Sequence, residues 1–336
     1  MQTSETATKT KKKNIVIIGT GGTIAGSGEE GVTAVYNSAQ VKVGELVSTL
    51  LCLESLANIK SIELCSIDSC DMSFEKLRKI ANYINETSEK GEADGFVITH
   101  GTDTLEETAY FLNLIVKTDK PVVITGSMRP GTAISADGPF NLYQAVALAK
   151  SDDAIGKGVL VAFSDAIYGA RDICKINTYR TTAFDQKDLG CFGYMRDDKA
   201  YFYNSSLKKH TLESEFDIKN LEALPKVEIV MFYVDADIEI LKHATENSDG
   251  IVLAGAGCGG SSSQWDAEIE KIINSKTPVV RSSRVANGLV TFDESEILKQ
   301  GIYADNLTPQ KARILLTLAL TKTKDISEIQ EMFKVY

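Results

Sequence analysis

The sequence predicts an α/β protein of two domains, each a three-layer α/β/α arrangement around a mainly parallel sheet. Two observations carry this prediction. Short apolar runs alternate with amphipathic helical segments along most of the chain, which is typical of βαβ units. A polar stretch, residues 206–225, interrupts this alternation, and a chain of 336 residues has room for two domains of ordinary size.

The first predicted domain, residues 14–205, follows a polar, lysine-rich segment, residues 1–13, that we expect to be a disordered tail. Within the domain, residues 104–116 place Leu105 and later apolar residues on one helical face. The apolar runs predicted as strands are residues 15–18, 96–99, 122–125 and 159–163.

The second predicted domain, residues 226–336, repeats the alternation after the predicted linker, residues 206–225. Its end, residues 308–333, is expected to be helical, with Pro309 in the first turn, where a missing N–H costs nothing. The remaining elements are predicted as strands at 227–232, 250–254 and 278–281 and as helices at 237–244 and 264–273.

Composition excludes several classes of partner. The net charge of −10 argues against nucleic acid and against anionic membranes, and no apolar run has the length of a membrane span. The six cysteines and three histidines show no metal-ligand spacing, so we expect no metal and interpret the cysteines as reduced thiols. The predicted location is the cytoplasm, and a periplasmic location is the alternative if a leader was removed before this numbering began.

Two threonines indicate the chemistry. Thr23 follows the apolar run 15–18 in a glycine-rich turn, and Thr102 follows the run 96–99 in a similar turn. Parallel sheets bind their ligands at the carboxyl ends of the strands, which is where both turns are predicted. A threonine hydroxyl is a weak nucleophile until a neighbouring group activates it, so candidate activators are needed.

Each candidate site residue has a structural alternative. Thr23 could be a turn residue, and Tyr36 could serve packing alone. Asp103, with Glu106 three residues later, matches the capping box of a helix N-terminus. Lys175 could be a solvated surface lysine.

A glycine motif offers a different function. Gly255-x-Gly257-x-x-Gly260 follows a predicted strand and precedes a helix, as in dinucleotide-binding folds. The acidic residue expected about 20 positions later, for the ribose hydroxyl, is absent, and the next strand ends near Arg281 instead. Dinucleotide binding is therefore disfavoured.

Longer motifs occur in order along the chain, and together they resemble the bacterial-type L-asparaginase/glutaminase family over nearly its whole length. The resemblance is greatest to the type II branch, with one segment like type I. The motifs are Thr20-Gly21-Gly22-Thr23-Ile24-Ala25-Gly26, His100-Gly101-Thr102-Asp103-Thr104, Met128-Arg129-Pro130, Ser135-Ala136-Asp137-Gly138 and Asn306-Leu307-Thr308-Pro309-Gln310-Lys311-Ala312-Arg313.

The resemblance implies an amidohydrolase that converts L-asparagine, and to a varying degree L-glutamine, through an acyl-enzyme on a threonine. It assigns catalytic roles to Thr23, Tyr36, Thr102, Asp103 and Lys175, with no metal or cofactor. Lys175 would act as a base toward Thr102 in its neutral form. The resemblance also implies a homotetramer made of two close dimers.

Substrate contacts depart from the family pattern. Ser69 is expected to bind the α-carboxylate of the substrate and Asp103 its α-ammonium. The segment beside them has Asp68 and Cys70 where type II members have glycine and glutamine. A family asparagine corresponds to Gly260, and a family glutamate, supplied by a neighbouring subunit, falls near Ser295.

These departures leave alternatives open. Asp68, Ser69 and Cys70, with Thr102 and Asp103, are the predicted substrate contacts. Asp68 is expected to supply negative charge near the ammonium; otherwise it stabilises a turn through its own backbone. An amino-acid-binding protein with low turnover on the same fold is the alternative function.

Overall fold

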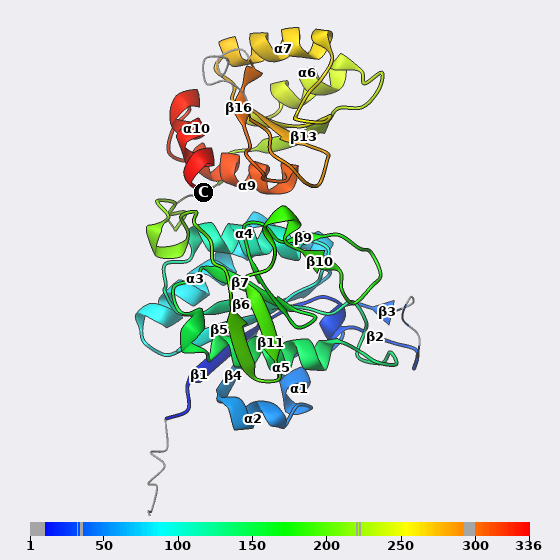
Figure 1. Ribbon diagram of the computed structural model, residues 1–336, viewed down its shortest axis with the longest axis vertical. Helices are drawn as coiled ribbons and strands as arrows, with labels where there is room; N and C mark the ends of the chain where they lie inside the picture. The colour runs from blue at the N-terminus through cyan, green and yellow to red at the C-terminus, as the bar shows by residue number, and fades with distance from the viewer. Residues whose placement is uncertain (1–10, 32, 34–35, 220, 222, 292–299) are drawn as a thin grey trace, which may run out of the picture.

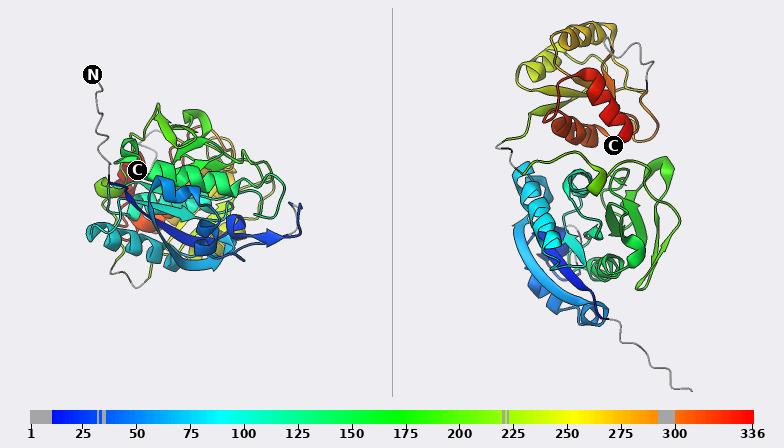
Figure 2. Two further views of the ribbon diagram at one scale, coloured as in Figure 1. Left: turned by 90° about the horizontal axis from the view of Figure 1, so that it is seen from below. Right: turned by 90° about the vertical axis from the view of Figure 1, so that its left-hand side faces the viewer.

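The computed structural model describes residues 11–336 except 32, 34–35, 220, 222 and 292–299. Two domains are stacked along the long axis of the molecule, and the C-terminus lies where they meet (Figures 1 and 2). Each domain has a sheet between helical layers, as the alternation predicts. The predicted tail, residues 1–13, falls mostly outside the described residues.

The larger sheet belongs to the N-terminal domain and has eight strands in the order β12-β11-β8-β7-β6-β5-β1-β4. Five of these strands, β4, β1, β5, β6 and β7, run parallel to one another, whereas β8, β11 and β12 extend the sheet beyond β7 in antiparallel fashion. Their bounds are β1 Asn14–Gly21, β4 Asn58–Ile67, β5 Gly95–Thr99, β6 Val122–Thr125, β7 Val159–Phe163, β8 Ala166–Gly169, β11 Gly193–Arg196 and β12 Lys199–Phe202.

Alternating side chains of the central strands fill two cores. Val16 and Ile18 of β1 pack in one buried cluster with α3 and α4, while Ile15 and Ile17 pack in another with α1, α2 and α5. A strand that buries both faces requires a continuous apolar run, as in β1. The helices are α1 Val43–Ser48, α2 Cys52–Leu56, α3 Phe74–Glu89, α4 Leu105–Ile115 and α5 Gly138–Ala149.

The C-terminal domain repeats this plan with four parallel strands in the order β13-β14-β15-β16. Helices α6 and α7 cover one face, and α9 and α10 cover the other, next to the N-terminal domain (Figure 1). The elements are β13 Val227–Met231, α6 Ile238–Glu246, β14 Gly250–Gly255, α7 Ser263–Asn274, β15 Val279–Ser283, β16 Ile302–Tyr303, α9 Pro309–Ala319 and α10 Ile326–Val335.

One hydrophobic cluster runs through both domains. It joins Phe111 of α4 to Leu315 of α9, and Phe216 and Ile218 of the connecting segment belong to it. Between β12 and β13, the described residues contain a single short 3₁₀ turn at Thr211–Glu213 and no strand or α-helix. This matches the polar character of the predicted linker, whose boundaries, like those of the domains, remain predictions.

Two predictions about elements need correction. The predicted terminal helix, residues 308–333, is two helices, because a new one begins after Asp325, whose carboxylate accepts hydrogen bonds from the amides of Ser327 and Glu328. The antiparallel extension of the large sheet was not anticipated. No helix in the described ranges is long and apolar enough to cross a membrane.

Candidate active site

Thr23 lies directly beyond the carboxyl end of β1. Gly22 before it has a φ of 81°, and a Cβ there would be 2.3 Å from the backbone of Gly101, so only glycine fits. Thr23 opens a 3₁₀ turn and is 8% exposed. Its Oγ1 is 2.7 Å from the hydroxyl of Tyr36, which β3 (Tyr36–Asn37) carries in a hairpin with β2 (Ser27–Gly28).

Thr102 follows the neighbouring strand β5, so the contact between Gly22 and Gly101 brings the two threonine turns together. Lys175 approaches from β9 (Cys174–Lys175), which pairs with β10 (Phe184–Asp185). Its Nζ donates to Thr102 Oγ1 at 2.8 Å and to Asp103 Oδ1 at 2.5 Å. The structure therefore brings together two threonine hydroxyls, each with a hydrogen-bond partner: Thr23 with the Tyr36 hydroxyl and Thr102 with the Lys175 amine.

The capping-box alternative for Asp103 is wrong. The residue at the N-cap of α4 is Thr104, which makes no side-chain cap hydrogen bond, and the Asp103 carboxylate is paired with Lys175 instead. Glu106, the other half of the expected box, accepts a hydrogen bond from the backbone N–H of Lys175 at 2.5 Å. Both acidic residues hold Lys175 rather than the helix end. Lys175 is also not a solvated surface lysine, because its side chain is only 16% exposed.

Asp68, Ser69 and Cys70 form a turn beside the threonines. Asp68 accepts hydrogen bonds from the Cys70 amide at 2.9 Å and the Ser38 hydroxyl at 3.0 Å, and these bonds lower the pKa of its carboxyl group. The turn role of Asp68 is therefore present in the structure, whatever its role toward substrate. Ser69 is 4% exposed, and Thr104 donates to its carbonyl.

These residues line a pocket of about 300 Å³. Six lining residues were not predicted as site residues: Gly22, Gly101 and Met128, which occur only within the motifs, and Thr33, Thr178 and Tyr179. Cys70 is not in the lining, although its Sγ lies 3.9 Å from Asp103 Oδ2. The full lining is Gly22, Thr23, Thr33, Tyr36, Asp68, Ser69, Gly101, Thr102, Asp103, Met128, Lys175, Thr178 and Tyr179.

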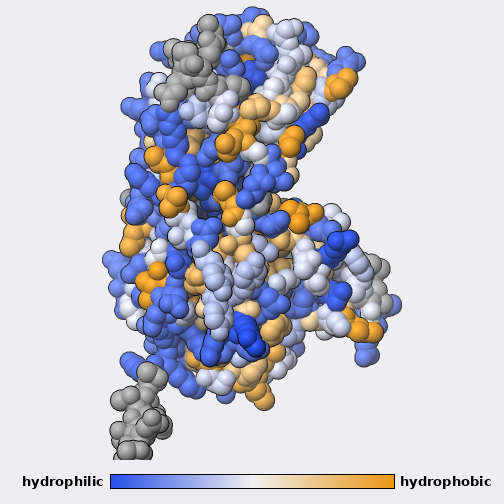
Figure 3. Space-filling model, in the orientation of Figure 1, coloured by the Kyte–Doolittle hydropathy of each residue, from blue (hydrophilic) through white to orange (hydrophobic). Residues whose placement is uncertain are grey.

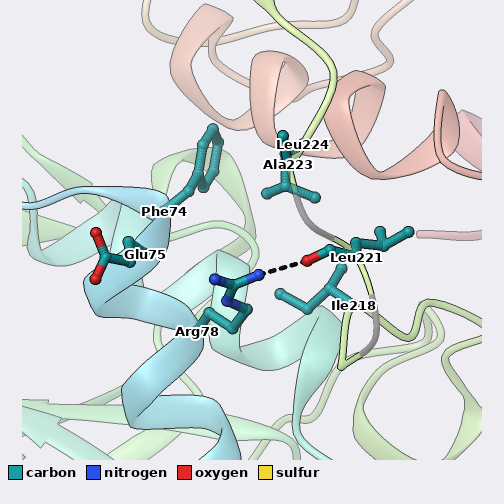
Figure 4. A pocket seen from close by; sticks show the side chains of 7 residues that line it. All are labelled: Phe74, Glu75, Arg78, Ile218, Leu221, Ala223 and Leu224. Carbon is teal, nitrogen blue, oxygen red and sulfur yellow. Dashed lines mark hydrogen bonds between the residues drawn. The ribbon is translucent and has the colours of Figure 1, made fainter.

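The lining comes entirely from the N-terminal domain. Gly260 lies in the C-terminal domain in a tight loop, where its backbone pairs with that of Ala256, and the predicted contact near Ser295 lies outside the described residues. A second hollow of about 310 Å³ lies between α3 and the connecting segment and contains none of the predicted residues (Figure 4).

One group of metal-type ligands lies at the edge of the pocket. Asp68, Cys70 and Asp103 offer ligand atoms within 4.8 Å of one another, the only such group found in the described part of the chain, and all three residues are exposed. The two carboxylates of this group suit a cationic group of a substrate as well as a metal, and one oxygen of Asp103 already pairs with Lys175.

Comparison with known proteins identifies the family. A model of the N-terminal asparaginase domain matches residues 14–208, and a model of the glutaminase/asparaginase C-terminal domain matches residues 226–333. The chain belongs to the asparaginase family. Its resemblance to that family in sequence is thereby confirmed.

Several relatives and a solved structure resemble this asparaginase-family chain over nearly their whole length. It is 43% identical to a glutaminase-asparaginase of Pseudomonas fluorescens biotype A, with 100% of this chain and 94% of the relative covered. It is 44% identical to L-asparaginase 2 of Escherichia coli strain K12, covering 96% and 93%. The crystal structure of a probable cytoplasmic L-asparaginase from Campylobacter jejuni superposes with a TM-score of 0.93 at 43% identity, covering 97% and 100%.

The family motif around Thr102 also contains a buried histidine. His100 is fully buried at the end of β5, and burial lowers its pKa to about 4. A neutral ring satisfies both of its contacts: Nδ1–H donates to the Gly101 carbonyl at 2.7 Å, and Nε2 accepts from the Thr108 hydroxyl at 2.9 Å. His100 thus ties the Thr102 turn to α4 without facing the pocket.

Proposed function

We propose that this member of the asparaginase family hydrolyses the side-chain amide of L-asparagine to L-aspartate and ammonia through an acyl-enzyme on Thr23. The observation that carries this proposal is the pair of activated hydroxyls in one pocket, Thr23 with Tyr36 and Thr102 with Lys175. The names of the relatives, L-asparaginase and glutaminase-asparaginase, support the substrate class.

Acylation begins at Thr23. Its Oγ1 bonds to the amide carbon of the substrate, and the Tyr36 hydroxyl, 2.7 Å away, accepts the Thr23 proton while it passes its own proton to the amide nitrogen. The C–N bond then breaks, and the nitrogen, which now carries that proton, leaves as ammonia. Water attacks the resulting ester, which releases aspartate and restores the Thr23 hydroxyl.

Lys175 and Thr102 form the second catalytic pair. With Nζ 2.8 Å from Thr102 Oγ1, a proton can pass between them, so Lys175 in its neutral form serves as a base through Thr102. Asp103, at 2.5 Å, orients the amine. General acid–base help of this kind contributes roughly 10²- to 10⁴-fold to rate.

The charges of an amino-acid substrate also have partners. Asp68 and Asp103 present carboxylates on one side of the pocket, within 4.8 Å of each other, and suit the α-ammonium. An unmatched cation in a partly desolvated pocket is costly, so two carboxylates favour a zwitterion. Ser69 and the surrounding turn suit the α-carboxylate, while Cys70 sits at the edge.

Ammonia release tests this function directly. The purified protein is assayed with L-asparagine and L-glutamine from micromolar to millimolar concentrations, and turnover of asparagine is expected. Binding of asparagine without ammonia release would support the alternative, a binding protein of low turnover. The ratio of the two rates measures the glutaminase activity.

The proposed assembly is a homotetramer in the cytoplasm. Large apolar side chains are exposed, among them Tyr203 at 78% and Val234 at 88%, and apolar surface flanks the indentation between the domains (Figure 3).

The six cysteines form no disulfide, which suits a reducing compartment, although a Haemophilus influenzae relative 45% identical is described as periplasmic. Light scattering should give four times 36.5 kDa, and cell fractionation decides the compartment.

A further inference from the structure

Lys311 is a buried cation outside the pocket. Its side chain is only 1% exposed, yet it ends in an ammonium group. Nζ donates to three backbone carbonyls: Ala170 at 3.1 Å, Arg171 at 2.8 Å and Ile173 at 2.5 Å. An ammonium has three donors, so these bonds account for all of them.

The position is unfavourable for the helix that carries it. Lys311 lies in the first turn of α9, where the helix dipole disfavours a positive charge, and burial of a charge adds a desolvation cost. The ammonium therefore does not serve α9. Its hydrogen bonds cross the domain boundary to residues 170–173, the turn that joins β8 to β9.

That turn leads into Lys175. Lys311 holds the carbonyl of Ile173, and two residues later the backbone N–H of Lys175 is held by Glu106. Glu106 belongs to α4, which packs against α9 across the boundary (Figure 1). The main chain beside Lys175 is thus fixed by two helices, one from each domain.

We propose that Lys311 is a positioning residue: it holds residues 170–173 so that the amine of Lys175 stays within hydrogen-bond distance of Thr102. This inference rests on the proposed function. It gives the C-terminal domain a part in the chemistry of a pocket that, in the described residues of one chain, it does not line.

The test compares Lys311→Met with Arg78→Met. Arg78 also donates to a backbone carbonyl at the domain junction, that of Leu221 at 2.6 Å, but this bond anchors the connecting segment and not the Lys175 turn (Figure 4). With L-asparagine, Lys311→Met is expected to lower kcat by about 10- to 100-fold with KM within about threefold, because a small misplacement of a reacting group is costly. Arg78→Met is expected to keep the wild-type kcat.

Hydrogen exchange of the backbone amides at residues 171–176 supplies a readout that does not require turnover. These amides should exchange faster in Lys311→Met than in the wild type and Arg78→Met. If Lys311→Met does not fold, Lys311→Gln, which keeps two amide donors, should show smaller changes in the same direction.

Three results would overturn the inference: an unchanged kcat in the folded Lys311 variant, an equal loss of kcat in Arg78→Met, or unchanged exchange at residues 171–176. If the wild-type protein releases no ammonia, the proposed function fails. The exchange measurement then decides by itself whether Lys311 holds residues 170–173.

Discussion

Lys175 is bound through both its side chain and its main chain. Nζ contacts Thr102 and Asp103, and the backbone N–H donates to Glu106. These three residues belong to one short segment, which comprises the turn after β5 and the start of α4. That segment therefore fixes the position of Lys175. Such preorganisation is expected of a group that must transfer a proton without first rearranging.

Substitution of Lys175 separates a base from a fixed charge. Arginine keeps the positive charge but does not give up its proton near neutral pH. We therefore expect Lys175→Arg and Lys175→Met to lower kcat by similar amounts, roughly 10²- to 10⁴-fold. Steady-state kinetics with L-asparagine measures both; an arginine variant that keeps most of the activity would leave Lys175 a purely electrostatic role.

Asp68 is predicted to act on binding rather than on turnover. Asp68→Asn removes the charge but keeps an oxygen that can accept from the Cys70 amide, so the turn is retained. The expected result is a KM about 10- to 100-fold higher, equivalent to about 1.4–2.7 kcal/mol, as for a lost charge-assisted hydrogen bond. Asp68→Gly combined with Cys70→Gln, which restores the more common family pattern, should recover part of the affinity.

A KM that does not change in Asp68→Asn, at normal thermal stability, would leave Asp68 only its role in the turn.

Part of this site could be predicted from the sequence. Thr23 and Thr102 each follow a continuous apolar run, which fixes their place at the strand ends. The role of Glu106 could not be found, because its spacing from Asp103 matches a capping box and only tertiary contact with Lys175 decides against it. Thr178 and Tyr179 reach the pocket from a loop without periodicity, so no local signal marks them.

At the scale of elements, the strands that bury both faces were predictable. In the large sheet the strands that were not predicted are β4, β8, β11 and β12. β8, β11 and β12 have only four residues each, and neither β4 nor β12 contains a buried residue, so none of them is a long, fully buried apolar run. β8, β11 and β12 form the edge of the sheet far from β1 and β5, which carry the threonines, whereas β4 pairs with β1 at the other edge. The two threonines therefore follow strands with a clear sequence signal, whereas the Asp68 turn follows β4, which has none.

The end of β5 also predicts a pH dependence of stability. Burial lowers the pKa of His100 to about 4 in the folded protein, whereas an unfolded histidine titrates near 6.5. Below pH 6.5 the unfolded state then binds more protons than the folded state. The contribution of His100 to the free energy of unfolding is therefore fully present above pH 6.5 and is lost as pH falls toward 4. The loss amounts to about 3 kcal/mol at most.

Nuclear magnetic resonance of the imidazole ring provides the check for His100. Its resonances should stay those of a neutral ring from pH 8 to below pH 5.5 in the folded protein. A midpoint near 6.5 would contradict the assigned burial and its hydrogen bonds to Gly101 and Thr108.

At the scale of the whole molecule, the two domains share one hydrophobic cluster but divide the chemistry. The pocket is lined by the N-terminal domain, and Lys311 of the C-terminal domain binds the turn that precedes Lys175. The sequence could predict the two domains from the interrupted alternation. It could not predict this contact, because a lysine in the first turn of a helix gives no sign of burial.

The central claim is that Thr23 forms the acyl-enzyme, and the Thr23→Ala variant tests it most directly. Ammonia release from L-asparagine is measured for wild type and variant at equal concentration, with circular dichroism to verify the fold. We predict that kcat of the folded variant falls by about a thousandfold or more, because no other group replaces the nucleophile. A folded Thr23→Ala variant that keeps wild-type ammonia release would contradict the account.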